Sequence, residues 1–280
     1  MTGYVLAAVL LGALIHASWN ALIKAQDDKF TAAALVAIGA AMVSLPIVAW
    51  LPAPAPAAWP YIVASSIIHV GYFALVGFAY RTADLGVAYP LTRGSAPPLT
   101  ALLAFLIVGE ALGFNQWLAI VVIAAGIIAL STDAIMRGGL TGPTALAAFA
   151  NAGVIVFYTL VDGLGARAAG NSLAYVTWMH VGTAILLVAL FLAIRGRRFL
   201  TDMRANAVFG LGAGGLALTS YAIALWAMTL APIGLVAALR ETSVLFAAIL
   251  GTIFFGESFG IKRWIALVLI VAGIVALRIG

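Results

Sequence analysis

Three ionisable residues, Arg93, Arg240 and Glu241, lie deep inside long apolar segments of the sequence. A charged side chain at the centre of a membrane helix costs at least about 2.5 kcal/mol, so each one needs a partner or a function. A guanidinium group can bind a carboxylate through two parallel hydrogen bonds. Two arginines and one glutamate would leave a positive centre able to hold the carboxylate of a ligand. A buried ion network that only holds two helices together is an equally open interpretation.

Other polar and aromatic side chains gather in the same apolar segments. One segment places His16 and Asn20 four residues apart, on one helical face, and another does the same with Tyr158 and Asp162. Aromatic residues at helical spacing pack more often than they bind, so the clustering carries more weight than any single member. The candidate binding residues are Arg93, Arg240, Glu241, Trp19, Asn20, His69, Tyr72, Tyr89, Ser95, Tyr158, Tyr221 and Trp226.

The segment around Arg93 has an unusual composition for a membrane helix. Residues 85–108 contain three prolines, and each proline removes a backbone donor from the helix. A broken helix survives in hydrocarbon only where it is buried or lines a watery cavity. The sequence therefore predicts a broken helix here, with Arg93 and the hydroxyl groups of Thr92 and Ser95 beside a cavity. A plain structural kink is the alternative.

The composition determines which elements must position these residues. At 65% hydrophobic and 8% charged residues, the chain is unlike a soluble domain, which carries roughly 25% charged residues. Apolar runs of about 20 residues recur from end to end, which favours membrane-spanning helices over the short alternating strands of a barrel. We expect an all-α membrane protein with ten transmembrane helices, at residues 3–23, 31–51, 58–80, 85–108, 114–131, 143–164, 172–194, 205–229, 233–255 and 262–278.

The sequence contains one stretch twice. Residues 109–131 reappear without a gap as residues 256–278, with 12 of 23 pairs identical. This duplication predicts two five-helix repeats, residues 1–133 and 142–280, joined by the linker 134–141. Because each repeat has an odd number of helices, the second enters the membrane from the opposite side, and the two are inverted around a central cavity.

The duplicated stretch itself is interpreted as scaffold. Glu110 and Glu257 are expected to cap the helix that follows each of them. Gly126 and Gly273 indicate close helix approach, within the chain or at a weak dimer face.

Basic residues predict the orientation in the membrane. Ten Lys and Arg residues lie in the connections after the first, third, fifth, seventh and ninth expected helices, against only Arg167 and Arg278 on the other side. The positive-inside rule places those ten in the cytoplasm and both termini on the periplasmic face of the inner membrane. The net charge of +5 is therefore a topology signal, and no nucleic-acid partner is expected.

Several kinds of chemistry have no motif in the sequence. There is no cysteine, no phosphate-binding loop, no HExxH metal motif and no GxSxG nucleophile motif. No enzyme activity, cofactor or metal is therefore expected.

The overall pattern resembles a known family. Ten expected helices in inverted halves, a GE-x2-G-x3-W turn before the last helix of each half, and the run APIGLVAAL at 231–239 are similar to the EamA family of the drug/metabolite transporter superfamily. The chain looks most like bacterial amino-acid and metabolite exporters of the YddG type. The resemblance implies a basket-shaped bundle whose central cavity opens alternately to either side. Small multidrug-type relatives have an essential Glu in the first helix, where this chain has His16 and Asn20, so the resemblance does not extend to proton-coupled cation export.

The expected function is secondary transport, with export of amino acids or similar small zwitterions from a lipid bilayer-embedded monomer or weak homodimer. Carriage of a nucleotide-sugar, a lipid-linked sugar or a drug is an alternative within transport. A membrane-embedded enzyme is the alternative from another class, and only His16 and His69 could contribute acid–base groups to it.

Overall fold

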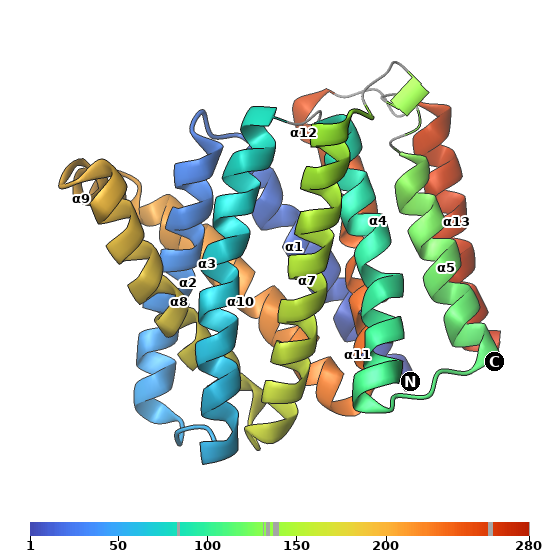
Figure 1. Cartoon of the computed structure of the whole chain (residues 1–280), viewed down its shortest axis with the longest axis horizontal. Coiled ribbons are helices and arrows are strands. Elements are labelled where there is room, and N and C mark those ends of the chain that lie inside the picture. Colours follow the sequence, from blue (N-terminus) through green and yellow to red (C-terminus); the bar gives the residue numbers. More distant parts are fainter. Residues whose placement is uncertain (83–84, 131, 133–134, 137–139, 257–259, 280) are drawn as a thin grey trace.

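Helices occupy all ten apolar segments in the computed structural model of the chain (Figure 1). The structure describes residues 1–82, 85–130, 132, 135–136, 140–256 and 260–279. Half of the predicted linker 134–141, namely residues 134 and 137–139, and the predicted cap Glu257 lie outside this part. The long helices are α1 Gly3–Lys24, α2 Lys29–Trp50, α3 Trp59–Thr82, α4 Leu85–Leu103, α5 Phe114–Ala129, α7 Gly142–Ala168, α8 Ser172–Arg195, α10 Ala207–Leu230, α11 Ile233–Arg240, α12 Ser243–Phe255 and α13 Ile261–Ile279.

The helices have the length and composition of membrane spans. Among the described residues, seven are long and apolar enough to cross a bilayer, and α5 is a shorter apolar helix. The chain is therefore a helical multi-pass membrane protein, while ten crossings and inverted repeats stay predictions. Both termini lie at one end of the bundle, which we call the terminal end (Figure 1). The connection between α1 and α2 lies at the other end, which we call the Lys24 end.

The duplicated stretches pack against each other. Helices α5 and α13 lie side by side at one edge of the bundle (Figure 1). A Cβ atom added at Gly126 would lie 3.0 Å from Cβ of Leu269, and one added at Gly273 would lie 2.7 Å from Cγ1 of Ile123. These glycines therefore allow close approach, as expected, and the helix they approach belongs to the same chain.

The broken helix is not where the prolines predict it. Helix α4 continues through Pro90, Pro97 and Pro98 and ends in a π-helical turn at Ala104–Val108. A proline removes only one helical hydrogen bond, and α4 packs against both α5 and α7, which hold the segment in place. The prediction of a break in 85–108 is therefore wrong.

The interruption falls instead in the proline-free segment 233–255, between α11 and α12. Both the backbone N–H and the hydroxyl group of Thr242 donate to the carbonyl of Leu239, three residues earlier, at 3.1 and 2.6 Å. Thr side chains compete in this way with the regular helical bonds. The resulting tight turn at Glu241 and Thr242 separates the two helices.

Candidate functional site

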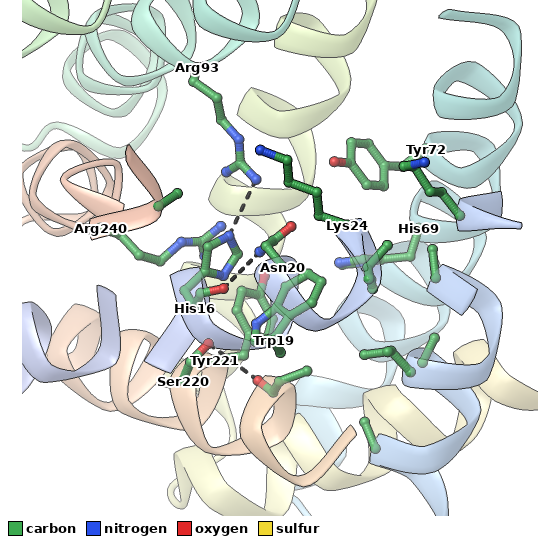
Figure 2. Close-up of a pocket in the computed structure, with 18 of the residues that line it drawn as sticks. His16, Trp19, Asn20, Lys24, His69, Tyr72, Arg93, Ser220, Tyr221 and Arg240 are labelled. Atoms are coloured by element: carbon green, nitrogen blue, oxygen red, sulfur yellow. Dashed lines mark hydrogen bonds between the residues drawn. The ribbon is translucent and has the colours of Figure 1, made fainter. Parts of the chain in front are cut away.

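A cavity of about 660 Å³ lies between the helices, with walls from α1, α2, α3, α4, α7, α8, α10, α11 and α12 (Figure 2). It reaches the Lys24 end of the bundle, where Lys24 and Lys29 line it. The family resemblance implies a cavity bounded mainly by the first, third, fourth, sixth, eighth and ninth expected helices, and all six contribute to the walls, together with α2 and α8.

Most of the predicted binding residues meet in this cavity. Nine of the twelve line it: Trp19, Asn20, His69, Tyr72, Tyr89, Arg93, Tyr158, Tyr221 and Arg240. Three do not. The hydroxyl group of Ser95 donates to the carbonyl of Leu91, within its own helix. Trp226 packs against Tyr4 and lines a smaller pocket elsewhere, and Glu241 lies behind the wall, against Arg93.

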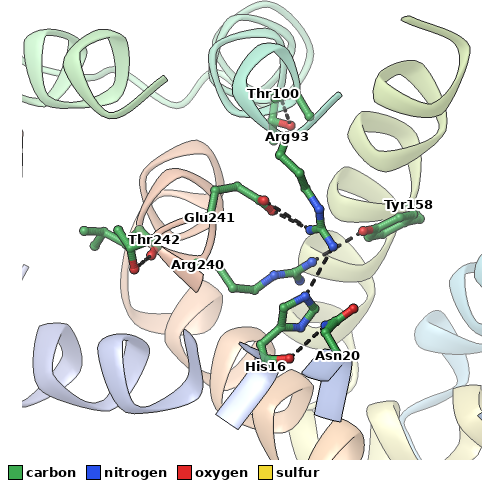
Figure 3. A network of polar contacts seen from close by, with 10 residues as sticks. His16, Asn20, Arg93, Thr100, Tyr158, Arg240, Glu241 and Thr242 are labelled. Carbon is green, nitrogen blue, oxygen red and sulfur yellow. Dashed lines mark hydrogen bonds and ion pairs between the residues drawn. The ribbon is translucent and has the colours of Figure 1, made fainter. Parts of the chain in front are cut away.

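Arg93 is fully engaged by protein groups (Figure 3). Its Nη1 atom donates to both carboxylate oxygens of Glu241, at 3.0 and 3.1 Å. Its Nη2 atom lies 3.3 Å from Nε2 of His16, and because a guanidinium only donates, the ring nitrogen must accept. The guanidinium also lies 5.5 Å from the ring centre of Tyr89. Arg93 and Glu241 thus form a buried ion pair between α4 and the turn that follows α11.

Arg240 has no such partner. Its Nη2 atom donates one long hydrogen bond, 3.4 Å, to the hydroxyl group of Tyr158. Its Nε and Nη1 atoms are buried and have no hydrogen-bond partner among the described residues. The guanidinium lies 5.1 Å from the ring centre of Tyr221, which supplies only a cation–π contact. A buried guanidinium without a carboxylate is energetically costly, so this group is suited to take up an anion.

Asp162 lies behind the cavity wall and holds Tyr221, the residue whose ring contacts Arg240. Asp162 is fully buried and accepts hydrogen bonds from the hydroxyl groups of Tyr175 and Tyr221. Tyr158 stacks near His69, with 4.7 Å between the ring centres. These contacts fix the wall around Arg240 before any ligand arrives.

Two buried polar atoms besides those of Arg240 lack a hydrogen-bond partner at the cavity wall, within the described residues. They are Nε1 of Trp19, a donor, and Oδ1 of Asn151, an acceptor. The Nδ2 atom of Asn151 donates to the carbonyl of Ala147 at 2.9 Å, which fixes the orientation of the amide. Oδ1 of Asn151 is therefore a directed acceptor that the described protein groups leave unused.

Sequence reasoning missed the basic residues at the mouth. Lys24 and Lys29 were expected only as loop charges that set the topology, yet both line the cavity. A usable signal existed, because Lys24 follows His16 and Asn20 at intervals of four residues and so continues their helical face. The described lining residues include four Lys or Arg side chains and no Asp or Glu. No group of three or more potential metal ligands occurs in the part of the chain that the structure describes.

An ion pair joins Glu110 and Arg167 at the terminal end of the bundle. Glu110 lies 2.6 Å from Nη2 of Arg167, at the end of α7, and accepts the backbone N–H of Ile233 at 2.8 Å. Arg167 also donates to the carbonyls of Met228 and Ala231. The prediction that Glu110 caps the following helix, α5, is therefore wrong. Glu110 caps α11 instead, because the chain folds back and brings the first residue of α11 beside it.

A bundle of membrane helices around a central cavity that holds buried charged side chains and reaches one end of the bundle is the architecture of a membrane transporter. The model of the EamA-like transporter family matches residues 1–132 and 143–279. The chain therefore belongs to the EamA-like transporter family.

Solved structures support the fold. One, described only as "Crystal structure of protein", is 21% identical, with a TM-score of 0.72 over 99% of this chain and 96% of the other. At this identity the likeness concerns the fold alone. No curated protein matches the chain.

Proposed function

We propose that this EamA-like transporter exports amino acids or similar small metabolites across the inner membrane by alternating access, and that Arg240 binds the substrate carboxylate. The observation that carries the proposal is the buried guanidinium of Arg240, which faces the cavity with two nitrogen atoms unpartnered. A substrate carboxylate would supply the charge and the hydrogen bonds that the described protein groups do not.

The size and walls of the cavity favour this class of substrate. A volume of about 660 Å³ falls in the range of sites for small organic ligands, about 300–1,000 Å³. The histidines that an enzyme would need are already engaged: His16 accepts from Arg93, and Nδ1 of His69 lies 2.9 Å from the carbonyl of Ser65. These contacts favour transport over a membrane-embedded enzyme.

The direction of opening favours export. The cavity reaches the Lys24 end, which the positive-inside rule places in the cytoplasm, and its described lining does not include Glu110 or Arg167 at the opposite end. A substrate would therefore enter this conformation from the cytoplasm. A tag on either terminus should be accessible in intact cells, and a tag reached only after lysis would reverse the orientation.

Counterflow in proteoliposomes tests the function. Vesicles that contain the protein and an unlabelled amino-acid mixture should accumulate labelled amino acids transiently, and Arg240→Gln should lose this exchange. Arg198→Gln, which changes an exposed arginine outside the cavity, is the matched control. Absence of exchange by the wild-type protein would show that the substrate class is wrong. Normal exchange by Arg240→Gln would show that Arg240 does not hold the substrate.

A further inference from the structure

The charges at the cavity wall suggest what the rest of the substrate must be. Four basic side chains line the cavity, and no acidic one does so among the described residues. Glu241 cancels the charge of Arg93, but no carboxylate lies against Arg240 in the described structure. The described residues that line the cavity therefore carry a net positive charge.

The two buried acids near the cavity are already engaged by protein groups. Both oxygens of Glu241 accept from Arg93. One oxygen of Asp162 accepts from Tyr175 and the other from Tyr221. A substrate ammonium group would have to displace one of these donors to gain a carboxylate partner, and it would be repelled by Arg240 while doing so.

A buried neutral acceptor remains at the cavity wall. Oδ1 of Asn151 is buried, unpartnered and directed by the bond from Nδ2 to Ala147. Asn151 precedes Tyr158 by seven residues on α7, about 10 Å along the helix, on the side towards the Lys24 end. An amide oxygen can accept a hydrogen bond from a hydroxyl group as well as from an ammonium group, but it cannot balance a full positive charge.

We infer that the site of Arg240 selects net anions, carboxylates that carry a neutral hydrogen-bond donor such as a hydroxyl group in place of an ammonium group. The inference rests on the proposed function, because it concerns the substrate of the same site. An anion makes the occupied cavity electrically neutral around Arg240, whereas a zwitterion brings in a second positive charge that no described lining group balances.

Matched pairs of substrates test this inference. Leucine and 2-hydroxy-4-methylpentanoate differ only in an ammonium or a hydroxyl group on the same carbon, and phenylalanine and 3-phenyllactate form a second pair. In counterflow, with protein-free liposomes as the blank, each hydroxy acid should compete at a concentration at least about tenfold lower than its amino acid. An inside-positive potential set with potassium and valinomycin should speed entry of the hydroxy acid and leave entry of leucine unchanged.

The outcomes separate this inference from the proposed function. If the amino acids compete equally well or better, the selection of net anions is wrong while transport through Arg240 stands. If neither member of a pair exchanges, the proposed substrate class fails as well.

A designed change sharpens the test. Asn151→Asp places a carboxylate at the cavity wall with almost the same shape as the amide. It should shift the preference towards leucine by about tenfold, because the ammonium group then has a charged partner. Arg198→Gln should keep the wild-type preference. An unchanged ratio in Asn151→Asp would contradict the inference, since the charge of the wall would then not decide the selection.

Discussion

Arg93 and Arg240 occupy equivalent places in the two halves of the chain, yet their surroundings differ. They are 147 residues apart, the same distance as the two copies of the duplicated stretch. Each donates to a ring-bearing side chain from the first helix of its own half, Arg93 to His16 in α1 and Arg240 to Tyr158 in α7. Only Arg93 has a carboxylate as well.

The difference can be traced to one position. Glu241 follows Arg240, and the residue that follows Arg93 is Gly94. A Cβ atom at Gly94 would overlap the side chain of Ile128 in α5, so α4 packs too closely there to carry a glutamate. Both halves thus have an arginine at this place, but only in the second half does a glutamate follow it. That glutamate, Glu241, neutralises Arg93 in the first half. One arginine is therefore paired with a carboxylate, and the other is not among the described residues.

The largest effect should come from removing the shared acid. Glu241→Gln leaves Arg93 buried without its carboxylate, which should lower the free energy of unfolding by about 3–5 kcal/mol. Thermal unfolding in detergent measures the loss. The double variant Arg93→Met/Glu241→Leu should recover much of it, because removing a buried pair together leaves no unpaired charge. A double variant as unstable as the single one would mean that the pair has no special role.

A smaller and different effect is expected at the other arginine. Arg240→Gln should reduce counterflow by about 30-fold, because a charge-assisted hydrogen-bond contact contributes about 2 kcal/mol. It should not lower the melting temperature. Stability should not fall because the removed charge has no carboxylate partner in the described structure. If Arg240→Gln unfolds as readily as Glu241→Gln, the two arginines have the same role and the contrast between the halves disappears.

The ion pair at the terminal end offers an intermediate case. Glu110→Gln loses the charge attraction to Arg167 but keeps an oxygen for the N–H of Ile233, so it should cost about 1 kcal/mol. Glu110→Ala loses both and should cost about twice as much. Equal melting temperatures for the two variants would show that the cap on α11 contributes nothing.

The smallest effect is expected at the membrane surface, where Asp28 pairs with Arg195 at 2.7 Å. Partial burial raises the pKa of Asp28, but hydrogen bonds from Thr31 and Arg195 outweigh it and lower the pKa to about 2. Because the pKa of Asp28 is depressed in the folded protein, its carboxylate contributes fully to the free energy of unfolding above the ordinary pKa near 3.8. This contribution is lost as the pH falls to about 2. The melting temperatures of wild type and Asp28→Asn should therefore differ slightly at pH 6 and converge near pH 2. A difference in melting temperature that stays the same from pH 6 to pH 2 would show that the charge of Asp28 does not cause it.

Membrane chemistry made much of the site predictable. Arg93, Arg240 and Glu241 had to find partners or a function because charges are rare in apolar helices. The face that contains His16 and Asn20 also led to the cavity. Trp226 was misplaced because helical spacing alone does not show which side of a helix meets the cavity.

Tertiary packing determined what the sequence could not show. The prolines of α4 predicted a break, but neighbouring helices hold that segment, and a threonine hydroxyl group interrupts the other half at Thr242. Glu110 caps a helix 123 residues away, a contact that no local motif encodes. Local rules for helix ends therefore fail where distant helices meet.

The cap from Glu110 also has a mechanical consequence. Helix α11 is eight residues long, about 12 Å, with its first N–H held by Glu110 and Arg240 at its far end. Motion that pulls the end of α7 away from this corner disturbs the contacts of Glu110 with Arg167 and Ile233 together. Because α11 connects this corner to Arg240, a displacement of its first residue would be transmitted along the helix to the cavity wall.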